Sequence, residues 1–139
     1  MFFVCTHNAA RSQMGEALLR RHADDRFEIS SAGFHPTAVH PLTHRALSEV
    51  GIDSAALRAK PATEFLGKAR LKYAIIVCGD EEPNCPRIFP FTLHTLHWPF
   101  DDPTKAEGAP EARLQEFRRV RDEIDAQIRT WLRDRDSEP

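Results

Sequence analysis

Residues 1–12, Met1-Phe2-Phe3-Val4-Cys5-Thr6-His7-Asn8-Ala9-Ala10-Arg11-Ser12, decide the fold of this chain. Four apolar residues predict a short strand that ends at Cys5, and the pattern from Gln13 to about His22 predicts a helix. The loop between them has small side chains, and the N–H groups of the loop and of the first helical turn lack intrahelical partners. The helix dipole also favours negative charge at that end. The stretch therefore predicts a site that holds an oxyanion against a Cys5 thiolate.

Arg11 and Ser12 strengthen this interpretation. A thiolate is stabilised by nearby amide donors, a hydroxyl and a positive charge, and the planar fork of Arg11 can also hold two oxygens of a tetrahedral anion. Taken singly, a buried cysteine at a strand end and a solvated helix arginine are ordinary structural features. Their combination as Cys-x5-Arg-Ser, between an apolar strand and a helix, favours an active site.

Composition limits the classes of protein to which the chain can belong. Its 139 residues predict one domain with a core of its own, and 19 basic against 21 acidic residues give a net charge of -2. This balance does not favour binding to nucleic acid or to an anionic membrane. No segment has the length of a transmembrane span, and residues 1–4 lack the features of a signal peptide. An odd number of cysteines argues against a disulfide framework, so we expect a cytoplasmic protein.

The chain alternates strands and helices. The predicted strands are residues 1–5, 27–31, 73–77 and 93–97. The predicted helices are residues 13–22, about 39–50 with Pro41 in its first turn and Gly51 at its end, a short helix after Pro61, and 110–134. This order predicts an α/β fold, a single four-stranded parallel sheet with helices on both faces.

Several polar or reactive residues follow the predicted strands. Cys5, Ser31 and Cys78 do so, as does the loop at residues 98–103, in which two prolines and two aspartates exclude regular structure. Ligands of parallel sheets bind at the carboxyl ends of the strands. We therefore expect these groups to gather at one edge of the sheet.

Six residues separate Cys78 from Cys85, which is the wrong spacing for half of a zinc site. The seven histidines also lack the spacing of a zinc hydrolase, and we expect no metal. By itself, Cys78 could be an inert packing residue and Cys85 an idle surface thiol. With Cys5 at the same edge, however, one thiol can attack a Cys5 adduct to form a disulfide, and a third can carry that disulfide outward.

Asp101 and Asp102 lie in a loop between Pro99 and Pro103. An aspartate in a turn is usually only a turn former. A carboxylate in a loop over an oxyanion pocket can instead act as a general acid.

The sequence resembles the thioredoxin-coupled arsenate reductases, which share the flavodoxin-like fold of the low-molecular-weight tyrosine phosphatases. The segments that carry the resemblance are residues 5–14, 31–33, 77–86, 97–103 and 117–124. They span nearly the whole chain. The pair Cys78-x6-Cys85 favours a reductase, because the phosphatases have no need of it.

The resemblance implies a mechanism. The implied substrate-binding residues are Thr6, His7, Asn8, Ala9, Ala10, Arg11 and Ser12, of which Asn8 and Ser12 shape the loop and the thiolate. Cys5 attacks arsenate while Asp102 protonates the departing oxygen. Cys78 then attacks Cys5, arsenite leaves, and Cys85 attacks Cys78. The resulting Cys78–Cys85 disulfide is reduced by thioredoxin.

The resemblance also bears on ions and partners. Some relatives hold a monovalent cation below the loop, here at Asn8, Glu16 and Ser31, but Pro61 stands where a further carboxylate is expected. We therefore expect the Lys60 ammonium in place of potassium. The implied protein is a monomer without a bound cofactor that takes its reducing equivalents from thioredoxin.

Three alternatives remain at this point. A small thiol such as mycothiol could replace thioredoxin as the electron donor. The chain could be a phosphatase of the same fold, although Thr104 stands where an aromatic residue would grip a tyrosyl ring. It could also be a non-enzymatic sensor that traps arsenite between its cysteines.

Overall fold

The computed structural model describes residues 1–23, 26–65, 71–79, 82 and 92–136, without the side chains of residues 65, 71 and 136. Its strands are β1 (Phe2–Cys5), β2 (Ser30–Gly33), β3 (Leu71–Ile76) and β4 (Thr92–His97). Its α-helices are α1 (Arg11–Ala23), α2 (Pro41–Ser48) and α3 (Pro110–Asp136), and its 3-10 helices are η1 (Ala62–Phe65) and η2 (Pro103–Lys105). No helix in these ranges is long and apolar enough to cross a membrane.

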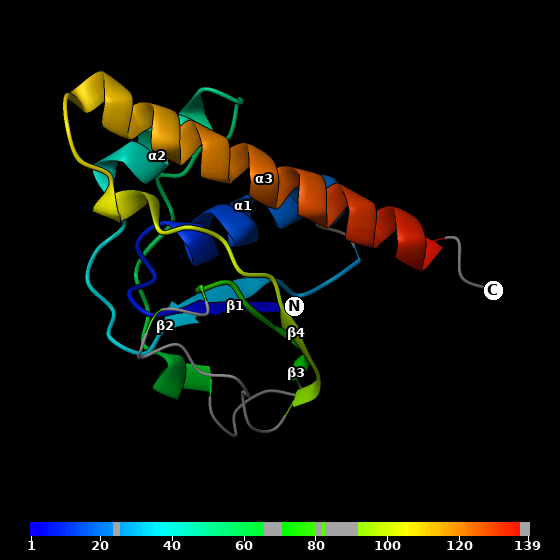
Figure 1. The fold of residues 1–139 in the computed structure, drawn as a ribbon. Helices are drawn as coiled ribbons and strands as arrows, with labels where there is room; N and C mark the ends of the chain where they lie inside the picture. The colour runs from blue at the N-terminus through cyan, green and yellow to red at the C-terminus, as the bar shows by residue number, and fades with distance from the viewer. Residues whose placement is uncertain (24–25, 66–70, 80–81, 83–91, 137–139) are drawn as a thin grey trace.

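The four strands form one parallel sheet in the order β2-β1-β3-β4, which confirms the expected architecture (Figure 1). The strand β1 is central, because Phe2 pairs with Ser30 of β2 on one side and with Ala74 of β3 on the other. All four strand residues of β1 are buried, as expected for a strand covered on both faces.

The two faces of the sheet are covered unequally. Phe3 and Cys5 of β1 belong to the main core, which they share with residues of α1, α2 and α3. Phe2 and Val4 point to the other face, where they join Ala62 of η1 in a smaller cluster. Helices therefore cover both faces, but in the described part of the chain all three α-helices lie on one face (Figure 1).

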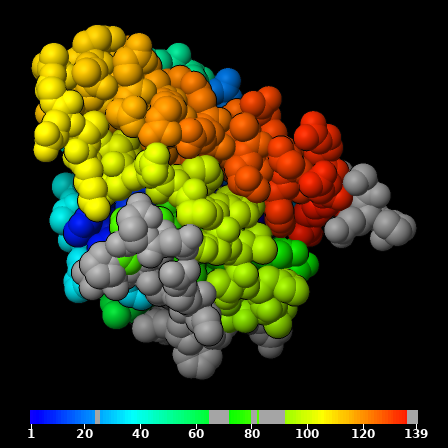
Figure 2. Space-filling model, in the orientation of Figure 1, coloured from blue at the N-terminus to red at the C-terminus, as the bar shows by residue number. Residues whose placement is uncertain are grey.

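The longest helix, α3, confirms the helix predicted at residues 110–134. Its buried stripe consists of Leu114, Phe117, Val120, Ile124, Ile128 and Leu132. Figure 2 shows α3, in orange and red, lying across the outside of the molecule above the yellow-green β4. The residues of β4 are half-buried or exposed, because this strand lies at the edge of the sheet.

The strand β2 lies later in the sequence than predicted, at Ser30–Gly33 instead of residues 27–31. Pairing starts at Ser30, which lies opposite Phe2, the first residue of β1. Pairing continues through Gly33, where a Cβ would lie 2.8 Å from both Asn8 N and Thr6 O. The glycine therefore allows β2 to pass against the loop that follows β1.

The helix α2 is shorter than the predicted 39–50. It begins at Pro41, and His40 caps it because the His40 Nδ1 accepts a hydrogen bond of 3.0 Å from Leu42 N. The chain turns away from the helical direction at Gly51, whose φ of 82° is readily adopted only by glycine.

Candidate active site

The loop between β1 and α1 wraps around the sulfur of Cys5. Cys5 is a buried free thiol, and Asn8 N donates a hydrogen bond of 3.3 Å to its Sγ. Asn8 adopts a φ of 52°, a left-handed conformation that asparagine tolerates better than most residues. Of the expected substrate-binding residues 6–12, only His7 has an exposed side chain. The loop is therefore a compact cradle with the thiol at its base.

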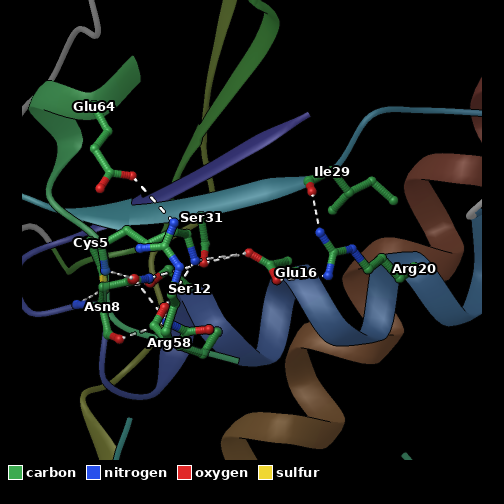
Figure 3. A network of polar contacts seen from close by, with 11 residues as sticks. Cys5, Asn8, Ser12, Glu16, Arg20, Ile29, Ser31, Arg58 and Glu64 are labelled. Carbon is green, nitrogen blue, oxygen red and sulfur yellow. Dashed lines mark hydrogen bonds and ion pairs between the residues drawn. The ribbon is translucent and has the colours of Figure 1, made fainter. Parts of the chain in front are cut away.

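A chain of hydrogen bonds lies beneath this cradle, and we call it the floor network (Figure 3). Its members are Cys5, Asn8, Ser12, Glu16 and Ser31. Asn8 Nδ2 donates to Ser12 Oγ at 2.7 Å, so the hydroxyl hydrogen of Ser12 remains available for Cys5 Sγ, 2.9 Å away. The Ser12 hydroxyl can thus donate a hydrogen bond to the sulfur of Cys5.

The Asn8 amide fixes the shape of the loop. Its Nδ2 also donates to Ser31 Oγ at 3.1 Å, and its Oδ1 accepts hydrogen bonds from Gln13 Nε2 at 2.8 Å and from Lys60 N at 2.9 Å. Every donor and acceptor of this buried amide is therefore satisfied, which holds the left-handed turn in place.

A buried ion pair closes the lower end of the floor network. Ser31 Oγ donates to Glu16 Oε1 at 2.8 Å, and Lys60 Nζ lies 3.6 Å from the same oxygen. Burial lowers the pKa of the Lys60 ammonium, and the charge of Glu16 offsets part of this effect. The Lys60 ammonium therefore faces Glu16, at the position where the sequence predicted it. No cluster of three possible metal ligands occurs among the described residues.

Arg11 lies at the start of α1 and is almost fully buried. Its NH1 and NH2 bind the two oxygens of the Glu82 carboxylate at 2.5 and 2.7 Å, and NH1 also donates to Phe100 O at 3.1 Å. Burial opposes its charge, but the hydrogen bond to Glu82 and the nearby Cys5 and Asp102 keep the pKa of Arg11 above its ordinary value. The sequence did not reveal Glu82 as a partner of this arginine.

Asp102 faces the same pocket, whereas Asp101 does not. Asp102 Oδ1 accepts hydrogen bonds from Thr104 N and Thr104 Oγ1 at 3.0 and 2.6 Å, which caps η2. Its other oxygen lies 3.5 Å from Arg11 NH2. The side chain of Asp101 is 72% exposed and pairs with Arg119. Asp102 is therefore a turn former and also a carboxylate at the pocket.

The pocket itself is small in this structure. It is lined by Cys5, His7, Ala9, Ala10, Arg11, Asp102 and Thr104 and has a volume of about 10 Å³. Such a volume holds about one water molecule. We call the groups that contact the Arg11 guanidinium, Glu82, Phe100 and Asp102, the outer wall.

Cys78 reaches the same edge of the sheet as Cys5. Val4 pairs with Ile76 across β1 and β3, and Val77 N donates to Val4 O at 3.0 Å. The backbone of Cys78 therefore follows β3 at the level where the loop follows β1. Its side chain is fully buried, and its carbonyl accepts a hydrogen bond from His97 Nε2 at 3.1 Å. The third predicted thiol, Cys85, lies outside the described residues.

Comparison with known proteins agrees with this geometry. The family model described as low molecular weight phosphotyrosine protein phosphatase matches residues 1–138. The chain is 38% identical to an arsenate reductase from Shouchella clausii and 39% identical to one from Halalkalibacterium halodurans, covering 94% of this chain and 93% of each relative. It also superposes with a TM-score of 0.68 on a thioredoxin-dependent arsenate reductase from Corynebacterium glutamicum, at 34% identity over 96% of this chain and 59% of that one.

Proposed function

This chain belongs to the low-molecular-weight phosphotyrosine protein phosphatase family, within its arsenate reductase branch, and we propose that it reduces arsenate to arsenite by a relay of Cys5, Cys78 and Cys85. One observation carries the proposal most strongly. The buried Cys5 thiol lies in an anion cradle with Arg11, and the backbone of Cys78 arrives at the same edge of the sheet. A plain hydrolase needs the cradle but not the second cysteine.

The first step is nucleophilic attack on arsenic. Arsenate binds to the loop amides and to the Arg11 fork, and the Cys5 thiolate forms a sulfur–arsenic bond. Asp102 delivers a proton to the departing oxygen, which leaves as water. The Ser12 hydroxyl stabilises the thiolate before attack, since it lies 2.9 Å from the sulfur.

The second step transfers electrons. Cys78 attacks the Cys5 sulfur, a disulfide forms between them, and the sulfur–arsenic bond breaks with its electron pair on arsenic, which leaves as arsenite. Cys85 then attacks Cys78 and restores the Cys5 thiolate. Two thiols are oxidised to one disulfide for each arsenate reduced, so the Cys78–Cys85 disulfide needs an external dithiol.

We propose thioredoxin as that dithiol and the cytoplasm as the compartment. The relay must return to three thiols after each turnover, and the cytoplasm keeps thiols reduced. All three cysteines come from one chain, so a monomer is sufficient.

Arsenite formation tests the proposal. With thioredoxin, thioredoxin reductase and NADPH, the unchanged chain should turn over repeatedly, whereas Cys5→Ser and Cys78→Ser should form no arsenite. Cys85→Ser should complete a single turnover and stop. Repeated turnover of Cys85→Ser with thioredoxin would contradict the relay. Supplying mycothiol or glutathione instead of thioredoxin identifies the donor.

The family description supports a phosphatase as the second candidate. Hydrolysis of an aryl phosphate needs only the cradle and Asp102, so it should survive Cys78→Ser and be lost in Cys5→Ser. Retained hydrolysis in Cys78→Ser also shows that this variant folds. Efficient hydrolysis without arsenite formation would favour the phosphatase, and stoichiometric arsenite binding without turnover would favour a sensor.

A further inference from the structure

The structure points to a role for Glu82 that no sequence pattern indicated. Its two carboxylate oxygens bind the two terminal nitrogens of Arg11 at 2.5 and 2.7 Å. Both side chains are nearly buried, with 3% of Arg11 and 9% of Glu82 exposed. Two oxygens of a tetrahedral oxyanion would occupy this arginine fork in the same way. Glu82 thus fills a position that a bound anion needs.

The other contacts of Arg11 involve the same two terminal nitrogens. Its NH1 also donates to Phe100 O, and its NH2 lies 3.5 Å from Asp102. Both terminal nitrogens are therefore engaged, and the adjoining cavity of about 10 Å³ is too small for a tetrahedral oxyanion. An oxyanion that binds both terminal nitrogens of Arg11 must therefore displace the Glu82 carboxylate.

Glu82 also connects Arg11 to the turn that follows Cys78. The Glu82 carboxylate accepts a hydrogen bond from Gly79 N, and Glu82 N donates to Gly79 O at 3.2 Å. Gly79 is the residue next to Cys78. A single carboxylate therefore ties this turn to the arginine of the cradle.

From these contacts we propose that Glu82 competes with the substrate oxyanion for Arg11, and that its displacement releases the turn next to Cys78. Glu82 is a positioning residue in this scheme. It holds the turn against Arg11 while the cradle is empty. When an oxyanion binds to the cradle, the contact between Glu82 and Arg11 breaks. Because coupling is reciprocal, loosening the turn should in the same measure favour oxyanion binding.

Affinity for inorganic phosphate tests the competition, since phosphate has the shape of arsenate and is not reduced. Calorimetry should show that Glu82→Gln binds phosphate about tenfold or more tightly than the unchanged chain, because a hydrogen-bonded charge is removed from the fork. Glu123→Gln is the matched control. It makes the same charge change in an exposed pair with Arg119 on α3, and its affinity should stay unchanged.

The alternative is that Glu82 holds Arg11 in the correct orientation for the anion. In that case Glu82→Gln would bind phosphate more weakly. An affinity that is equal or weaker overturns the proposal, and so does an increase of the same size in Glu123→Gln.

Labelling of Cys78 tests the release. In a chain that carries Cys5→Ser and Cys85→Ser, Cys78 is the single cysteine. Phosphate should speed its alkylation several-fold when Glu82 is present, and it should have little effect after Glu82→Gln, where alkylation is already fast. Alkylation that phosphate leaves unchanged or slows in the chain with Glu82 overturns the coupling.

This inference rests on the proposed function only in assigning Arg11 to the substrate. The two can fail separately. If the chain forms arsenite but Glu82→Gln binds phosphate no more tightly, then only the role of Glu82 is wrong. If Glu82→Gln binds phosphate more tightly but no donor supports arsenite formation, then the reductase assignment is wrong.

Discussion

The floor network and the outer wall both contribute to the pocket, through Cys5 and Asp102 respectively, but they are held in different ways. In the floor network, the Asn8 side chain makes its four hydrogen bonds to residues of α1, β2 and the segment before η1. None of these bonds involves Arg11. The outer wall, in contrast, reaches the cradle through Arg11, which binds Glu82, Phe100 O and Asp102.

This difference separates the stable part of the site from the part that can change. A substrate anion can bind without disturbing any bond of Asn8, but it must compete for the bonds of Arg11. The cradle can thus keep its shape while Glu82, which is hydrogen-bonded to Gly79 next to Cys78, moves. Variants in the floor network should therefore affect folding and thiol reactivity, and changes in the wall should act with little effect on the rest of the fold.

The largest effect should come from Gly33→Ala, which forces the floor network apart. The new Cβ would lie 2.8 Å from Asn8 N and Thr6 O, and neither backbone atom can move without distorting the loop. We expect a loss of about 3 kcal/mol of unfolding free energy together with the loss of phosphate binding. Urea unfolding and calorimetry measure the two effects.

Gly51→Ala is the control for that substitution. Its Cβ would meet nothing within 4 Å, but its φ of 82° strains an alanine. It should cost about 1 kcal/mol of stability and leave phosphate affinity unchanged. Equal losses of affinity in the two variants would show that the contact at Gly33 is not what shapes the cradle.

Lys60→Met should have the next largest effect, because it leaves Glu16 buried without its neighbouring ammonium. We expect a loss of about 2 kcal/mol in urea unfolding, below the usual cost of breaking a buried pair, since Glu16 keeps Arg20 and Ser31. Arg20→Met removes the other charged partner of Glu16. The side chain of Arg20 is 48% exposed. This substitution should cost less than about 1 kcal/mol, and the reverse order would mean that Lys60 does not balance the buried charge.

The sequence predicted the floor network better than the outer wall, and the reason is physical. Cys5, Arg11 and Ser12 lie in one short segment whose strand, loop and helix each have a local signal. Asp102 was predictable too, because loops after parallel strands meet at one edge. Glu82 was not, since its pairing with Arg11 spans 71 positions and depends on side-chain placement that no local pattern encodes.

The bounds of β2 show the same limit within the fold. Alternation placed the strand at residues 27–31, but its register is set by its partner. Phe27 leaves the sheet and packs on Trp131, with ring centroids 5.9 Å apart. In the sequence, Gly33 resembles a residue that breaks a strand. In the structure it is the last residue of β2, and the neighbouring loop leaves no room for a side chain there.

A smaller effect is expected for Ser12→Ala, which removes two bonds of the floor network, those of the hydroxyl with Cys5 and Asn8, and little volume. Ser12 Oγ lies 2.9 Å from Cys5 Sγ, so its loss should slow the alkylation of Cys5 by iodoacetamide at pH 7 about tenfold. In a Cys78→Ser and Cys85→Ser background Cys5 is the only thiol labelled. Ser48→Ala, which alters an exposed hydroxyl at the end of α2, should leave the rate unchanged. An unaltered rate in Ser12→Ala would show that the Ser12 hydroxyl does not stabilise the Cys5 thiolate.

The smallest effect should appear on acidification, which acts on the wall and spares the neutral bonds of Asn8. Burial opposes the ionisation of Glu82, but hydrogen bonds from Arg11 and Gly79 N outweigh it, so the pKa of this carboxyl is below its ordinary value. A lowered pKa means that the pair stabilises the folded state above about pH 4.3, the unfolded value for glutamate. That contribution is lost as the pH falls through the lower folded pKa.

The amide resonance of Gly79 reports this step directly, because its N–H donates to the Glu82 carboxylate. It should titrate below the pH range of an ordinary glutamate, and the titration should vanish in Glu82→Gln. The Asn8 side-chain amide, which donates to the hydroxyls of Ser12 and Ser31, should not follow that titration. If both amides shifted together, the floor and the wall would form one cooperative unit, and an anion could not displace the wall while the cradle kept its shape.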